Sequence, residues 1–128
     1  MQKILVVGAG FMGSGIAQVS AQAGYQVHLM DIQSVITDGA LKDIRWSVEK
    51  LAAKGLLKES SEKVLARISP EKDLSSASEV DWVIEAALEE EELKRGIFQE
   101  LDRISRPETP LATNTSSIPI TRLAENTR

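Results

Sequence analysis

A chain of 128 residues has the length of a single domain, and a composition of 42% hydrophobic and 27% charged residues is typical of a globular protein with a buried core. The formal net charge is -4 and basic residues alternate with acidic ones, which argues against a nucleic-acid partner because neutralising phosphates requires clustered Lys and Arg. The absence of cysteine excludes disulfides, thiolate nucleophiles and zinc–thiolate sites, and it fits a cytoplasmic protein.

Residues 4–30 contain no Asp, Glu, Lys or Arg, as do many signal peptides and membrane spans. A membrane-spanning helix needs about 20 predominantly apolar residues. Glycines and glutamines interrupt this segment, and its only dense apolar run is residues 4–7. We therefore expect neither a signal peptide nor a membrane partner.

The first predicted elements form a βαβ unit. Residues 3–7 are a short apolar, β-branched run, which predicts a strand buried on both faces. Residues 11–23 have helical spacing of small and apolar side chains, and Gly24 is placed to end that helix. Residues 25–30 predict a second strand that ends at Asp31. Two strands joined in this way are parallel, with a right-handed crossover.

Two helices are predicted next. Residues 34–54 have an apolar stripe at helical spacing, and Gly55 follows the end of this helix. Either Ser60 or Ser61 can cap a shorter helix that extends through Arg67.

The second half of the chain again alternates predicted strands with helices. After a polar stretch at residues 69–79, residues 82–86 predict a buried strand and residues 90–104 an amphipathic helix. Residues 111–114 predict a last short strand, and Pro119 suits the first position of a further helix. Together these elements predict an α/β fold, a doubly wound and mainly parallel sheet of the Rossmann type, in which residues 1–128 form one domain.

A glycine pattern links the first strand to the first helix. Gly8 permits a tight turn, Gly10 leaves room for a pyrophosphate, and Gly13 lets the helix approach the strand. The backbone N–H groups around Phe11 and Met12, at the start of the helix, are then available to phosphate oxygens. This pattern predicts a dinucleotide site, although the glycines could simply serve as turn residues.

Asp31 follows the second strand at about the twenty-residue distance expected of a carboxylate that binds the adenosine ribose. Because residues 32–34 include no Arg or Lys that could receive a 2′-phosphate, NAD is favoured over NADP. A helix cap at Asp31 is the alternative role, and a flavin would share the same fingerprint.

Three segments carry a family resemblance. They are GAGFMGSGIAQV at residues 8–19, WVIEAALE at residues 82–89 and ATNTSSI at residues 112–118. With Lys94 and the helix that contains it, these segments closely resemble the 3-hydroxyacyl-CoA dehydrogenase family over essentially the whole chain.

The resemblance implies roles for residues at the carboxyl ends of the strands. Glu89 and Lys94 should lie by the nicotinamide ribose, Asn114 should contact the cofactor, and Ser116 should contact the cofactor and orient the 3-oxygen of the substrate. Without the resemblance, Glu89 and Lys94 would be a weak surface ion pair and Ser116 a helix cap or turn residue.

Ser47 and Lys54 match the family's coenzyme A contacts on the long helix. Seven residues apart, they share one helix face and could bind the phosphate or pantetheine of an acyl-CoA substrate. The alternative is an ordinary solvated helix flank. No metal site is expected.

The only histidine, His28, lies in a predicted strand and is expected to be structural or at the surface, not a catalytic base. The resemblance implies that a catalytic His and a helical dimerising domain belong to segments that this sequence does not contain. It also implies that the complete protein, a homodimer, reversibly oxidises 3-hydroxyacyl-CoA to 3-oxoacyl-CoA in fatty-acid metabolism, including β-oxidation. This chain alone should bind NAD without turnover.

Two other functions remain open. The chain could be a stand-alone NAD(H)-binding sensor or a subunit completed by another protein. It could also belong to another two-domain dehydrogenase of the same superfamily, one that acts on hydroxy acids or sugar acids. If the chain is truncated, it also exposes a sheet edge that the next strand would have covered, and we expect the isolated domain to self-associate through it.

Overall fold

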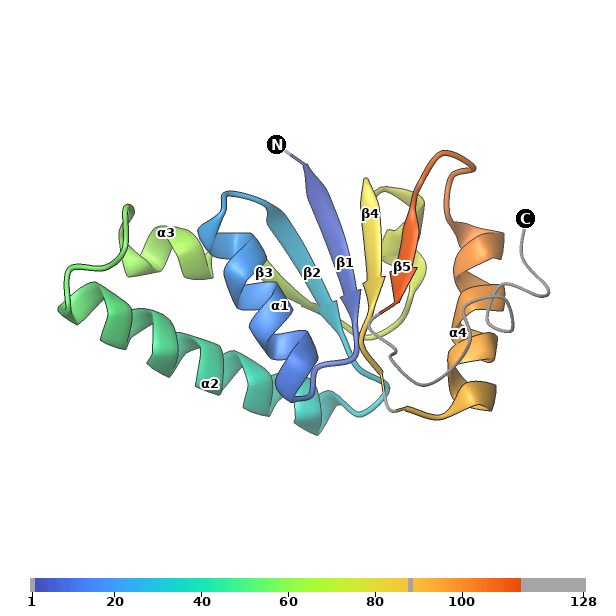
Figure 1. Ribbon diagram of the computed structural model, residues 1–128, viewed down its shortest axis with the longest axis horizontal. Coiled ribbons are helices and arrows are strands. Elements are labelled where there is room, and N and C mark those ends of the chain that lie inside the picture. The colour runs from blue at the N-terminus through green and yellow to red at the C-terminus, as the bar shows by residue number, and fades with distance from the viewer. Residues whose placement is uncertain (1, 88, 114–128) are drawn as a thin grey trace.

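The computed structural model describes residues 2–87 and 89–113 (Figure 1). Its sheet has five parallel strands in the order β3-β2-β1-β4-β5. The strands are β1 (Lys3–Val7), β2 (Gln26–Met30), β3 (Ile68–Glu71), β4 (Trp82–Glu85) and β5 (Leu111–Thr113). This arrangement confirms the predicted doubly wound α/β fold.

Helices cover both faces of the sheet. They are α1 (Phe11–Gln22), α2 (Ser34–Ala53), α3 (Ser61–Leu65), the 3₁₀ helix η1 (Ser75–Ser78) and α4 (Glu91–Ile104). Figure 1 shows α1, α2 and α3 on one side of the sheet and α4 on the other. None of the helices in the described part of the chain is both long and apolar enough to cross a membrane.

The central strand β1 supplies side chains to two separate cores. Ile4 and Val6 pack with α1, α2 and α3, whereas Leu5 and Val7 pack with η1 and α4. Successive side chains of a strand point to opposite faces, so a strand covered on both faces needs apolar residues at every position. This requirement explains the unbroken apolar run in the sequence.

Strand β3 lies partly within the stretch 69–79, for which the sequence predicted no strand. It pairs in parallel with β2, for example Ile68 beside Val27, and among the described residues it has no strand on its other side. Pro70 cannot donate a ladder hydrogen bond, and proline is tolerated on such an edge strand. An edge strand pairs on one side only and is less buried, so it needs no apolar run. This is why the polar sequence of β3 did not predict a strand.

The predicted helix ends are largely confirmed. Gly24 and Gly55 follow α1 and α2 with φ of 101° and 70°, the left-handed conformation that glycine adopts without strain. Of the two serines that could cap the third helix, Ser60 does so, because its side chain accepts a hydrogen bond from the Lys63 backbone N–H. That helix ends at Leu65, two residues earlier than predicted.

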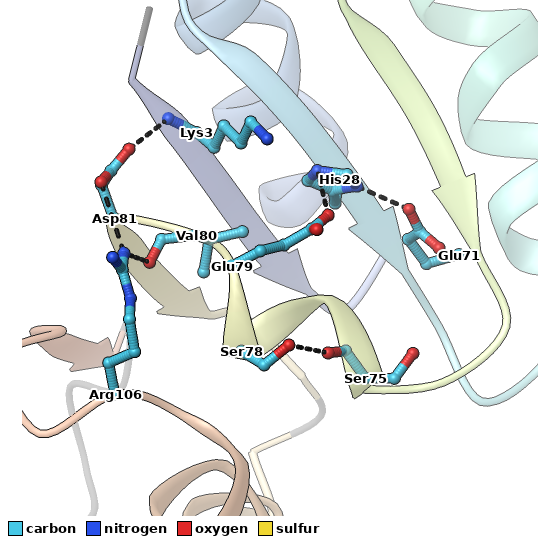
Figure 2. A network of polar contacts seen from close by, with 9 residues as sticks. All are labelled: Lys3, His28, Glu71, Ser75, Ser78, Glu79, Val80, Asp81 and Arg106. Carbon is cyan, nitrogen blue, oxygen red and sulfur yellow. Dashed lines mark hydrogen bonds and ion pairs between the residues drawn. The ribbon is translucent and has the colours of Figure 1, made fainter.

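A polar network fastens the connection between η1 and β4 to the rest of the sheet (Figure 2). The Lys3 backbone N–H donates to Asp81 Oδ2 at 2.8 Å, and Arg106 Nη2 donates to the Val80 carbonyl at 2.7 Å. In the same view the His28 ring of β2 lies between two carboxylates: Nδ1 is 2.5 Å from Glu71 Oε1 of β3, and Nε2 is 3.8 Å from Oε1 of Glu79, which precedes β4. The network therefore connects β1, β2, β3 and the residues that precede β4.

Candidate functional site

Gly8 brings the end of β1 against the end of β4. Its φ is 108°, and its N–H donates to the Met30 carbonyl at 2.7 Å. A Cβ at this position would lie 2.6 Å from both the carbonyl carbon and the oxygen of Ala86, closer than real Cβ contacts allow. Only glycine fits, so the turn predicted from the sequence is required by the packing of the two strands.

Gly13 allows α1 to start directly against this turn. A Cβ there would lie 1.6 Å from the Gly8 carbonyl oxygen, whereas a Cβ at Gly10 would meet nothing within 4 Å. The space beside Gly10 is therefore open, as close approach of a diphosphate requires.

The amino-terminal turn of α1 offers backbone donors to an anion. Gly10 is the N-cap residue and has no side chain to cap the helix, and the first turn contains no acidic residue. The first N–H groups of a helix lack partners within it and carry the positive end of its dipole. The side chains of Phe11 and Met12 in this turn are exposed. The loop can thus bind phosphate oxygens.

Asp31 follows β2 and is held beside the glycine loop. Its Oδ2 accepts a hydrogen bond from the Ala9 N–H at 2.9 Å, and its Oδ1 accepts one from the Gln33 N–H at 3.0 Å. Each carboxylate oxygen can accept a further bond, so the side chain can still bind hydroxyl groups. Gln33, not Asp31, is the N-cap residue of α2, which contradicts the alternative role of Asp31 as a helix cap.

A buried ion pair lies at the same edge of the sheet, at the ends of β4 and β5. Lys94 Nζ donates to Glu85 Oε1 at 2.9 Å and to Oε2 at 2.7 Å, and the two side chains are 2% and 0% exposed. Thr113 Oγ1 donates to Glu85 Oε1, and the Ala87 N–H donates to Oε2, both at 2.6 Å. Lys94 is therefore not part of the weak surface pair considered from the sequence.

Sequence reasoning missed Glu85. A signal was present, since a carboxylate that ends an apolar strand has to find a partner when it is buried. The partner itself is nine residues away on α4 and could not be identified from the strand alone.

Glu89 joins this ion pair from its exposed side. Its Oε1 lies 3.4 Å from Lys94 Nζ, and its side chain is 42% exposed. The structure therefore brings Glu89 and Lys94 together in an ion pair of which only the Glu89 side is exposed, and their place by the nicotinamide ribose stays a prediction. Asn114 and Ser116, the other residues predicted for this end of the site, lie outside the described residues.

The two predicted coenzyme A contacts differ in their surroundings. Ser47 lines a cleft of about 950 Å³ between α1 and α2, and its Oγ accepts a hydrogen bond from Gln18 Nε2 at 2.9 Å. Lys54 caps the far end of α2, is exposed and does not line the cleft. The wall of the cleft includes the exposed side chains of Phe11 and Trp46.

His28 has the structural surroundings expected from the sequence. Its ring lies on β2 with only 14% of the side chain exposed, between Glu71 and, at 3.8 Å, Glu79. In the part of the chain that the structure describes, no group of three or more His, Asp or Glu side chains could hold a metal ion.

Comparisons with known proteins agree with this geometry. Residues 3–128 match the family described as 3-hydroxyacyl-CoA dehydrogenase, NAD binding domain. The chain is 45% identical over 122 residues to a probable 3-hydroxybutyryl-CoA dehydrogenase of Deinococcus radiodurans, a match that covers 95% of this chain and 44% of that protein. A probable 3-hydroxybutyryl-CoA dehydrogenase of Bacillus subtilis is 43% identical over 125 residues, with 97% and 44% covered.

Solved structures show the same relationship. The crystal structure of 3-hydroxybutyryl-CoA dehydrogenase from Escherichia coli K12 gives a TM-score of 0.94 at 38% identity, over 99% of this chain and 27% of that chain. The (S)-3-hydroxybutyryl-CoA dehydrogenase from Ralstonia eutropha gives 0.92 at 37% identity, over 99% and 45%. The chain thus spans less than half the length of these relatives.

Proposed function

The chain belongs to the family of 3-hydroxyacyl-CoA dehydrogenase NAD-binding domains, and on this premise we propose that residues 1–128 form the NAD-binding domain of an enzyme that reversibly oxidises 3-hydroxyacyl-CoA to 3-oxoacyl-CoA. The observation that carries the proposal is the glycine loop, closed to side chains at Gly8 and Gly13, with the Asp31 carboxylate fixed beside it. A bound nicotinamide ring would supply the carbon that accepts or donates hydride.

The adenosine and diphosphate end of NAD fits the first βαβ unit. The backbone from Gly8 through Gly10, Phe11 and Met12 to Gly13 would hold the diphosphate, because it combines open space with the donors of a helix start. Asp31 would accept hydrogen bonds from the ribose hydroxyls and repel a 2′-phosphate, since no Arg or Lys follows it in residues 32–34.

The nicotinamide end would lie across the ends of β4 and β5, where ligands bind in open parallel sheets. Glu89 and Lys94 would lie by the nicotinamide ribose. Asn114 would contact the cofactor, and Ser116 would contact the cofactor and orient the substrate's 3-oxygen. The family pattern supports these four assignments, and the position of Lys94 and Glu89 at the carboxyl end of β4 supports the first two.

An acyl-CoA would bind along α2. Ser47, which lines the cleft between α1 and α2, and Lys54, which is exposed at the end of the same helix, would contact the coenzyme A moiety. Their spacing on one helix supports this assignment.

The proposal for the whole protein extends further. Oxidation of a hydroxyl requires a base, and the only histidine of the chain is engaged by Glu71. We therefore propose that this chain by itself binds NAD without turnover. We also propose, from the family resemblance, that the complete protein acts as a homodimer in the cytoplasm, in fatty-acid metabolism including β-oxidation.

Calorimetry with NADH and NADPH tests the proposal. We expect the chain to bind NADH at least about tenfold more tightly than NADPH, because like charges that face each other in a binding site cost several kcal/mol and about 1.4 kcal/mol already corresponds to a tenfold difference. Asp31→Asn keeps an oxygen acceptor but removes the charge, so it should narrow this preference.

Asp38→Asn, the same change at an exposed position on α2, is the matched control and should leave the preference unchanged. Failure of the unmodified chain to bind either dinucleotide would refute the proposed function.

A further inference from the structure

The buried pair of Glu85 and Lys94 is unusual for the sheet of a small domain. Both side chains are almost completely removed from solvent, with 0% and 2% exposed. Burying two charges costs several kcal/mol per ion before their attraction is counted, and apolar residues of similar size often stabilise a protein equally well. Packing of β4 against α4 therefore gives no sufficient reason for an ion pair at this position.

The donors of Lys94 are directed at two carboxylates. An ammonium has three N–H donors. Two of them reach the oxygens of Glu85 at 2.9 and 2.7 Å, and on the solvent side Nζ lies 3.4 Å from Glu89 Oε1. Lys94 thus lies between a buried carboxylate and a carboxylate that is 42% exposed.

Glu85 is itself fixed from two further directions. The Thr113 hydroxyl on β5 and the Ala87 N–H after β4 each donate to it at 2.6 Å. Its carboxylate therefore accepts four hydrogen bonds, two from Lys94 and two from the strand ends. Such a fully bonded carboxylate has a single orientation, and it transmits that orientation to the ammonium.

We propose that Glu85 is a positioning residue for cofactor binding, which holds the Lys94 ammonium so that Lys94 in turn directs the Glu89 carboxylate toward the nicotinamide-side ribose. This inference rests on the proposed function and adds a residue to it. Glu85 does not touch the ligand. Its contribution is to keep a charged, flexible side chain in one place before the ligand arrives, which reduces the ordering cost of binding.

The test compares three ligands that share the adenosine diphosphate moiety. NADH and ADP-ribose contain the second ribose, whereas ADP lacks it. Calorimetry on Glu85→Gln should show NADH and ADP-ribose bound about tenfold more weakly than by the unmodified chain, as expected for loss of a charge-assisted hydrogen bond. Binding of ADP should change less than about twofold.

A second variant separates a positioning role of Glu85 from a purely structural role of the Glu85–Lys94 pair. The double variant Glu85→Gln/Lys94→Met removes both buried charges and should recover thermal stability lost by the single variant. If Glu85 acts on Glu89 only through Lys94, the double variant binds NADH as weakly as Lys94→Met alone. If the pair serves folding alone, the double variant binds NADH more tightly than either single variant. This comparison also covers the case in which the single variant does not fold.

Glu59→Gln is the control, because it breaks an ion pair with Arg67 that lies on the α3 side of the sheet. It should leave binding of all three ligands unchanged. Equal weakening of ADP and NADH in Glu85→Gln would overturn the inference while leaving the proposed function intact. A difference in NADH affinity between the double variant and Lys94→Met would also overturn it. Absence of binding by the unmodified chain would overturn both.

Discussion

The glycines of the loop and of α1 differ in what a methyl group would meet. At Gly8 and Gly13 the added carbon collides with backbone atoms, which cannot move aside as a flexible side chain could. At Gly10 and Gly15 it would meet nothing within 4 Å. Two of these residues are thus required by packing, and the other two leave room along the surface where a ligand can approach.

This difference leads to a prediction for Gly13→Ala. The new Cβ would lie 1.6 Å from the Gly8 carbonyl oxygen, so either α1 or the loop has to shift. Overpacking of this kind costs about 1–3 kcal/mol. We expect at least that loss in the free energy of unfolding measured in urea, together with loss of NADH binding.

Gly15→Ala provides the matched control in the same helix. It adds the same methyl group where space is open, and alanine is favoured over glycine inside a helix by about 0.5–1 kcal/mol. We expect the free energy of unfolding to rise by about this amount. A loss comparable to that of Gly13→Ala would contradict the packing argument.

At the residue scale the sequence predicted the binding loop better than the ion pair. The glycine spacing and Asp31 follow one another within a local βαβ unit, so their relation can be read along the chain. The contact between Glu85 and Thr113 depends on how β4 and β5 pair in register. Such a contact has no local sequence signal.

Among the predicted helices, α3 is the one for which the sequence offered two alternative N-cap residues, Ser60 and Ser61. The Ser60 side chain accepts from the Lys63 N–H at 3.2 Å, whereas Ser61 is the first residue of the helix. Helix α3 is short, but its Val64 is buried in the core shared with α1 and α2. Its cap therefore affects a packed element and not only a surface turn.

Ser60→Ala should lower the free energy of unfolding by about 1 kcal/mol, the usual cost of removing an N-cap side chain. Chemical denaturation would measure the change. Ser61→Ala is the control, since alanine is favourable inside a helix, and it should leave stability unchanged or slightly raised. Equal losses in the two variants would show that the cap does not matter.

The prediction of elements failed at β3 for a physical reason. Strand periodicity arises from burial, and the sequence Ile-Ser-Pro-Glu has one buried residue, Ile68, at the edge of the sheet. Its place is set by pairing with β2 and by the contact of Glu71 with His28, which are tertiary features. The other four strands contain apolar runs, which can be recognised in the sequence without knowledge of the fold.

For the whole molecule, the Asp81 contacts connect the first strand to segments that come much later in the chain. Asp81 accepts from the Lys3 N–H, and Arg106 lies 3.5 Å away beyond α4 (Figure 2). The hydrogen bond from the Lys3 N–H, assisted by Arg106, holds the pKa of the Asp81 carboxyl below its usual value. Folding thus favours the ionised form of Asp81.

This pKa shift gives a stability change with a defined sign. The unfolded Asp81, with a pKa of about 3.9, binds a proton more readily than the folded one. The contribution is therefore present above that pH and is lost as the pH falls through the lower folded pKa. Below pH of about 4, we expect the free energy of unfolding to fall more steeply in the unmodified chain than in Asp81→Asn. Urea titrations at several pH values would measure this, and parallel curves would contradict it.

The cleft between α1 and α2 also gives the molecule an optical property. The Trp46 indole in its wall is 65% exposed, and the Lys50 ammonium lies 4.6 Å from the ring centroid. The wavelength and intensity of fluorescence from such an exposed indole change when a ligand covers it. The other tryptophan, Trp82, lies outside the lining of the cleft at the start of β4. With Trp82 replaced by Phe, the protein would contain its own fluorescent reporter for molecules that settle against α2.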